Sequence, residues 1–278
     1  MASAAVGRIP DSKSLFAIFK YSIYALLCLN AFFFFEEEFF ASAVTYGESV
    51  SPGQVVEAFA ATIDTTAWIV LLLIFELQTS VIRDERIEGV SKWTLRGVSG
   101  LCYLFILYSF WGYIAKVYTL SSGFAPFPVA DVCSLAGGNA SLALSLDDYV
   151  PLGAANCQAL AGGQLYRLGA YPVYADVASV SALVRLAWVD VINAAAWLGV
   201  VVVLEADVWQ QKRDALSDHF LWISKISKAI LYGTLLAAGV YWGFLGDFVD
   251  FWDAVLWLVA FVFIEMNFFE WHAEEAEG

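Results

Sequence analysis

The chain has 278 residues, of which 60% are hydrophobic and only 15% are charged, and its formal net charge is −14. Soluble domains carry about 25% charged residues, so this composition indicates a lipid environment. The acidic balance argues against nucleic acid as a partner, because phosphate binding requires Lys and Arg. The lipid bilayer is therefore the first partner that the sequence predicts.

Six apolar segments are long enough to cross a membrane, for which about 20 residues are needed. These segments are 15–35, 58–82, 97–118, 180–204, 222–245 and 251–269. The last two are separated by only five residues, which favours a tight helical hairpin. No cleavage signal follows a short apolar core at the N-terminus, so we expect the first segment to be a retained helix. The prediction is an all-α, polytopic integral membrane protein with one membrane domain over residues 1–278.

The distribution of basic residues predicts the orientation in the membrane. Eleven Lys and Arg lie on one side of the predicted membrane. They are found before or in the first turns of the first segment, between the second and third segments, and between the fourth and fifth. Only three lie on the opposite side. Cytoplasmic loops retain an excess of Lys and Arg. We therefore expect both termini in the cytoplasm, in a plasma membrane or bacterial inner membrane.

Residues 120–180 form the one long polar stretch, which this orientation places outside the cell. It is rich in Gly, Ala, Ser and Pro, and the run SLALSLDDYV within it favours a short strand or helix. Cys133 and Cys157 share this loop, so they suit a disulfide if the loop faces an oxidising compartment.

The sequence offers little for metal or enzyme chemistry. It has two histidines, no Cys-x-x-Cys motif, no His-Glu-x-x-His and no Gly-x-Ser-x-Gly. We expect no metal, no other cofactor and no catalytic residues, and we regard an enzyme as the weakest of the functional interpretations.

One pattern recurs three times along the chain. In each copy a polar residue precedes a Trp by four positions, and a Glu follows that Trp by eight. The copies are Asp64/Trp68/Glu76, Asn193/Trp197/Glu205 and Asp253/Trp257/Glu265. A basic residue also begins the apolar run of the segment before each copy, namely Lys20, Arg96 and Lys228. The repetition predicts three related helical hairpins.

The glutamates of the repeat are the first candidate site. Glu76, Glu205 and Glu265 would lie roughly 10 Å inside the cytoplasmic interface, where a charge is unfavourable by about 3 kcal/mol. They are candidates for ion binding or proton relay as an acidic ring. The alternative is that Lys20, Arg96 and Lys228 neutralise them in ion pairs that fix the helix register.

A second polar layer is expected about 18 Å from the glutamates, towards the outside. It contains Asp64, Asn193 and Asp253, with Asp190 and Asp250 one turn further out. Asp64 and Glu76 lie about 120 degrees apart around a straight helix, which argues against a continuous channel. The tryptophans lie too deep for an interfacial belt, so we expect them to pack between helices.

These features predict permeation or sensing of a cation or proton through buried carboxylates. The alternative function is a non-catalytic structural or accessory membrane subunit that assembles with itself, as a homo-oligomer, or with partner membrane proteins.

Overall fold

The computed structural model describes residues 12–47, 50–78, 89–160, 162–211 and 218–261. Within these ranges, four helices are long and apolar enough to cross a membrane: α1 (Ser12–Tyr46), α4 (Val90–Gly123), α5 (Val177–Gln211) and α6 (Asp218–Leu245). Shorter helices are α2 (Val55–Ala58), α3 (Ala60–Glu76) and a helix over residues 248–261, where the described part of the chain ends. The protein is therefore predominantly helical, with several membrane-spanning candidates.

Helix α1 extends well beyond the segment predicted from hydropathy, which ended at residue 35. Glu36, Glu37 and Glu38 continue the helix because glutamate is a strong helix former, even though it is not apolar. The helix ends before Gly47, whose φ of 74° is a conformation that glycine adopts without strain.

Glu38 connects α1 to the start of α3. Its carboxylate accepts hydrogen bonds from the backbone N–H groups of Ala61 (2.9 Å) and Thr62 (3.0 Å), and its residue is only 1% exposed. The first N–H groups of a helix have no partner within the helix, and an anion stabilises this end of the helix dipole. A glutamate just beyond the apolar segment 15–35 therefore caps a neighbouring helix inside the protein.

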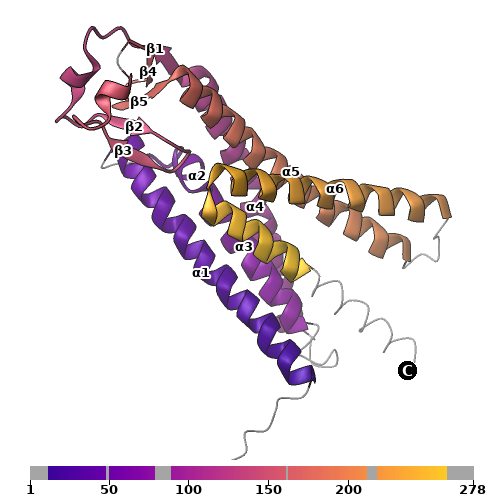
Figure 1. Ribbon diagram of the computed structural model, residues 1–278. Coiled ribbons are helices and arrows are strands. Elements are labelled where there is room, and N and C mark those ends of the chain that lie inside the picture. Colours follow the sequence, from indigo (N-terminus) through magenta and orange to yellow (C-terminus); the bar gives the residue numbers. More distant parts are fainter. Residues whose placement is uncertain (1–11, 48–49, 79–88, 161, 212–217, 262–278) are drawn as a thin grey trace, which may run out of the picture.

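Buried apolar side chains of α1, α3, α5, α6 and the helix over residues 248–261 form one core. Helix α3 contacts α1 and α4, α4 contacts α5, and α5 contacts α6 (Figure 1). Leu27, Val200, Leu235 and Leu256 come from four different helices and are at most 1% exposed. Large side chains such as those of Phe40, Leu104 and Ile230 point outward, as expected where helices face lipid.

The prediction of an all-α protein was wrong in one respect, because residues 124–176 contain a five-stranded sheet. Its strands are β1 (Phe124–Pro126), β2 (Ser141–Ala143), β3 (Tyr149–Pro151), β4 (Leu165–Leu168) and β5 (Val173–Asp176). Their order is β1-β4-β5-β2-β3, with β2 and β5 parallel and the other pairs antiparallel. Strands of three or four residues are too short to give a clear alternating pattern in the sequence.

The sheet lies at the end of the bundle where α1 and α4 finish and α5 begins (Figure 1). The predicted disulfide is confirmed: Cys133, in the 3-10 helix η3 (Val132–Leu135), is bonded to Cys157, in η4 (Cys157–Leu160). It borders a small core of its own that includes Leu152, Leu165 and Tyr174. The polar stretch is thus a folded cap on the helices.

Candidate functional site

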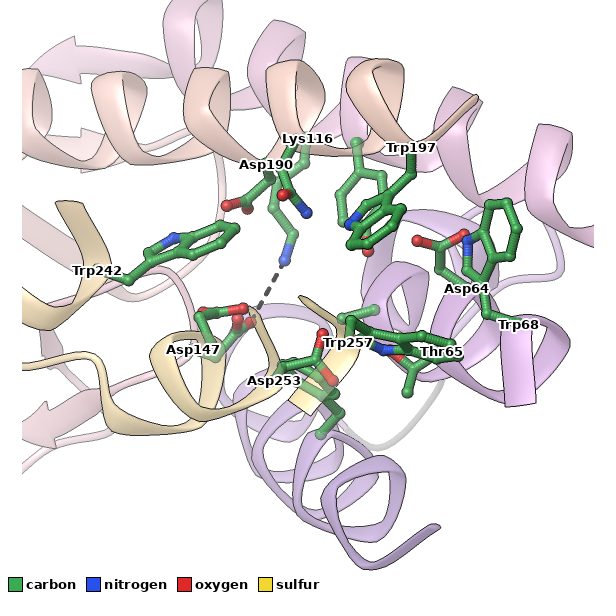
Figure 2. Close-up of a pocket in the computed structure, with 15 residues that line it drawn as sticks. Asp64, Thr65, Trp68, Lys116, Asp147, Asp190, Trp197, Trp242, Asp253 and Trp257 are labelled. Atoms are coloured by element: carbon green, nitrogen blue, oxygen red, sulfur yellow. Dashed lines mark hydrogen bonds and ion pairs between the residues drawn. The ribbon is translucent and has the colours of Figure 1, made fainter. Parts of the chain in front are cut away.

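A cavity of about 40 Å³ lies among the helices and is lined by several polar and charged side chains (Figure 2). We call it the aspartate cavity because five of its lining residues are aspartates. These are Asp64, Asp147, Asp190, Asp250 and Asp253. Its other lining residues are Phe34, Ala61, Thr65, Trp68, Tyr113, Lys116, Asn193, Trp197, Trp242 and Trp257.

The structure brings together all five residues that the sequence assigns to the outer polar layer. Asp64 comes from α3, Asp190 and Asn193 come from α5, and Asp250 and Asp253 come from the helix over residues 248–261. The spacing of three residues within each of the last two pairs keeps their members on one helix face. Three helices thus direct polar groups into one space.

Two of these aspartates are held by neutral donors. The Ser109 hydroxyl donates to Asp64 Oδ1 over 3.1 Å, and the Asn30 side-chain amide donates to Asp253 Oδ1 over 2.9 Å. Ser109 and Asn30 are themselves at most 1% exposed. Neutral donors orient the carboxylates without cancelling their negative charge.

Among the described residues, Lys116 is the one cation that lines the aspartate cavity. It lies on α4, and its Nζ is 3.4 Å from Oδ1 of Asp147, which lies between β2 and β3. Figure 2 shows the lysine nitrogen between Asp190 and Asp147. Neither Lys116 nor Asp147 belongs to the threefold repeat, so the sequence pattern predicted no site at these two residues.

A second cavity of about 40 Å³ also contacts Lys116 and Asp147. It is lined mainly by α1, α2, α4 and the sheet, and Thr45, Glu57 and Tyr149 provide polar groups to it. The Lys116–Asp147 pair therefore borders both cavities.

The three repeat tryptophans line the side of the aspartate cavity that faces the apolar core. Trp197 and Trp257 are 8% and 5% exposed and pack edge to face, with ring centroids 6.3 Å apart. Phe261 lies 4.6 Å from Trp197, centroid to centroid. These aromatic rings place part of the apolar core next to the cavity.

Glu76 is neutralised by the lysine that the sequence offered as its alternative partner. Its Oε1 is 2.6 Å from Lys20 Nζ and accepts a hydrogen bond from the Tyr21 hydroxyl over 3.0 Å. The Tyr24 hydroxyl donates to Oε2 over 3.3 Å. Glu76 is 4% exposed, so this is a buried ion pair between α1 and α3.

The other residues of the predicted inner layer lie in different surroundings. Glu205 is exposed on α5, and Glu265 lies outside the described residues. Lys228 Nζ is 2.6 Å from Asp207 Oδ2, which also accepts from the Ser224 hydroxyl. Arg96 is exposed, with its guanidinium 6.0 Å from the centre of the Trp93 ring. The two described glutamates therefore do not share one site.

Burial also affects titratable groups near the sheet end of the helices. It raises the pKa of Asp247, which lies between α6 and the helix over residues 248–261. It likewise raises the pKa of Tyr149, whose hydroxyl donates to the Leu146 carbonyl over 2.9 Å. Both shifts favour the neutral form of groups close to the two cavities.

Several residues that shape the site were not evident from the sequence. Trp242 lines the aspartate cavity, but it belongs to no repeat and follows no motif. Lys116 and Asp147 are brought together only by the folding of the sheet against α4. No family model, no curated protein and no solved structure matches this chain.

Proposed function

We propose that the chain is a six-span membrane protein that senses or conducts protons or small cations through the aspartate cavity. The observation that carries the proposal is the imbalance of charge there, with five aspartates and a single lysine among the described residues that line the cavity. Like charges in a confined, poorly hydrated space are unfavourable unless protons or cations compensate them.

The threefold repeat supports three related hairpins. Its polar and aromatic positions all line the same cavity, although they come from distant parts of the chain: Asp64, Asn193, Asp253, Trp68, Trp197 and Trp257. A site at the junction of internal repeats is common in membrane transport proteins. Helix α3 and the helix over residues 248–261 are then the second and sixth spans.

Two features support the predicted orientation in a plasma or bacterial inner membrane. The disulfide between Cys133 and Cys157 lies in the cap formed by the sheet, and disulfides persist in oxidising compartments. Lys92 and Arg96, in the first two turns of α4, lie at the end of that helix opposite the sheet, as expected for basic residues on the cytoplasmic side. In this orientation the aspartate cavity lies closer to the outer surface than Glu76.

The aromatic side of the cavity determines how permeation would occur. Trp197 packs against both Trp257 and Phe261, and these three rings belong to the apolar core that borders the cavity. Conduction therefore requires these rings to move, whereas sensing requires only binding on the sheet side.

Uptake by liposomes tests the proposal. The full chain is reconstituted, and uptake of H⁺, Na⁺, K⁺ and Ca²⁺ is followed with indicator dyes under an imposed potential. We expect uptake of at least one of these ions, reduced about tenfold or more in an Asp190→Asn/Asp253→Asn variant. Asp148→Asn is the matched control, because Asp148 is exposed beside Asp147 and does not line the cavity.

The alternative function, a non-catalytic membrane subunit, is favoured by the ion pairs at the other end of the helices. Lys20–Glu76 and Lys228–Asp207 each join two helices and leave the charges compensated within the chain. This alternative gains support if the same liposomes take up none of the four ions and the aspartate variant changes only thermal stability.

A further inference from the structure

We propose that the aspartate cavity exchanges protons rather than metal cations, and that Lys116 is the residue that determines this specificity. The inference rests on the proposed function and names its cargo. Three features of the cavity carry it: two buried polar atoms without partners, a cation supplied by the protein, and the arrangement of the carboxylates.

Two polar atoms of the lining residues have no hydrogen-bond partner among the described residues. They are Oδ1 of Asp190, an acceptor, and Nε1 of Trp242, a donor. Trp242 is only 3% exposed, and its ring projects into the space between Asp190 and Asp147 (Figure 2). Buried polar groups are rarely left unsatisfied, so a species in the cavity must both donate and accept.

Water meets both requirements, whereas a bare metal cation meets only one. A cation could bind Asp190 Oδ1, but it could not accept a hydrogen bond from the N–H of Trp242. A volume of about 40 Å³ holds more than one water molecule, since one needs about 10–15 Å³. Water molecules that bridge carboxylates provide a path for protons.

Lys116 occupies the position that a metal cation would otherwise take. Its side chain is 14% exposed, and its ammonium group lies among the aspartates at 3.4 Å from Asp147. A second cation entering the cavity would be repelled at short range in a medium of low dielectric constant. A proton adds to a carboxylate oxygen and removes its charge, so the repulsion does not arise.

The geometry of the carboxylates also favours protons over metal cations. In the described part of the chain, no three His, Cys, Asp or Glu side chains lie in positions that could share a metal ion. The acids line the cavity from different elements and are spread around it (Figure 2). Such spacing suits water-mediated exchange better than direct coordination.

The proton step is simple and balanced. A hydronium ion gives one proton to a carboxylate such as that of Asp190, so that one O–H bond breaks and another forms, and no electrons are exchanged. The titratable groups that face this exchange come from α3, α4, α5, the segment between β2 and β3, and the helix over residues 248–261. These groups are Asp64, Tyr113, Lys116, Asp147, Asp190, Asp250 and Asp253.

Proton release on addition of salt tests the inference independently of ion flux. Weakly buffered full-length protein in detergent receives NaCl or choline chloride, and a pH indicator reports the protons that sodium displaces. We expect no difference between the two salts for the wild type. Lys116→Met should bind Na⁺ with an apparent affinity at least about tenfold tighter and release protons.

Lys116→Arg keeps the charge and should behave as the wild type. Lys225→Met is the matched control, since Lys225 is exposed on α6. If sodium releases protons from the wild type, and Asp190→Asn/Asp253→Asn abolishes the release, the cavity binds metal cations and only this inference fails. A folded Lys116→Met protein that gains no response to sodium also overturns it.

If the Asp190→Asn/Asp253→Asn variant takes up as many protons as the wild type when acid is added, the aspartates do not exchange protons, and the proposed function fails as well. Should Lys116→Met not fold, the wild-type response to sodium still decides the question.

Discussion

At the scale of single residues, the carboxylates of this protein differ mainly in what neutralises them. Glu76 has Lys20 at 2.6 Å, and Asp207 has Lys228 at the same distance. Asp190, by contrast, keeps a buried oxygen without a partner among the described residues. A carboxylate with a bonded cation fixes helix register, whereas one that faces water can exchange a proton.

The buried pair between α1 and α3 should be structural. Lys20→Met removes the cation and leaves Glu76 buried with only neutral donors, so we expect a loss of about 3–5 kcal/mol in the free energy of unfolding. Glu76→Gln together with Lys20→Met removes both charges and should recover most of this loss. Unfolding in detergent micelles, followed by circular dichroism, measures the difference.

Lys225→Met serves as the control for loss of a lysine, because Lys225 is exposed. A Lys20→Met protein as stable as the wild type would show that the Lys20–Glu76 pair contributes nothing to the fold. The double variant should also retain ion uptake, since neither residue lines the aspartate cavity.

At the scale of elements, the approach of α2 to α4 depends on one glycine. A Cβ atom at Gly112 would collide with the backbone carbonyl oxygen of Val56 and approach its side chain. Val56 is 3% exposed, so α2 is held firmly against α4. A backbone atom cannot move aside as the end of a flexible side chain can.

Gly112→Ala should therefore destabilise the protein by about 1–3 kcal/mol, the usual cost of overpacking. Gly100→Ala is the matched change on the same helix, at a position where a Cβ meets open space. It should stabilise the helix by roughly 0.5–1 kcal/mol, because alanine has the higher helix propensity. Equal melting temperatures for the two variants would contradict the close contact.

The helices could be predicted from the sequence more readily than the sheet. A long apolar run predicts a helix by itself, because every backbone hydrogen bond of a helix is local. The sheet pairs β1 with β4 and β2 with β5, across separations that no local pattern encodes. The boundary of α1 was missed for a different reason, since hydropathy ends at Glu36 while helix propensity does not.

At the scale of the whole molecule, the repeat accounts for only part of the site. Its spacing identified Asp64, Asn193 and Asp253, which line one cavity together. Lys116 and Asp147 come from α4 and from the cap, and their contact exists only in the folded protein. The repeat glutamates, by contrast, do not share one environment: Glu76 lies in a buried ion pair, whereas Glu205 is exposed.

The position of the cap determines from which side of the membrane protons or cations would reach the aspartate cavity. With Cys28 and Cys102 replaced by Ser, single cysteines at Asp148, in the cap, and at Lys225, near the start of α6, report on the two ends. A membrane-impermeant maleimide should label Asp148→Cys in intact cells and Lys225→Cys only after permeabilisation. Both positions are exposed, so access differs only by side. The reverse pattern would place the disulfide in the cytoplasm, where thiols are kept reduced, and would direct the cavity to the cell interior.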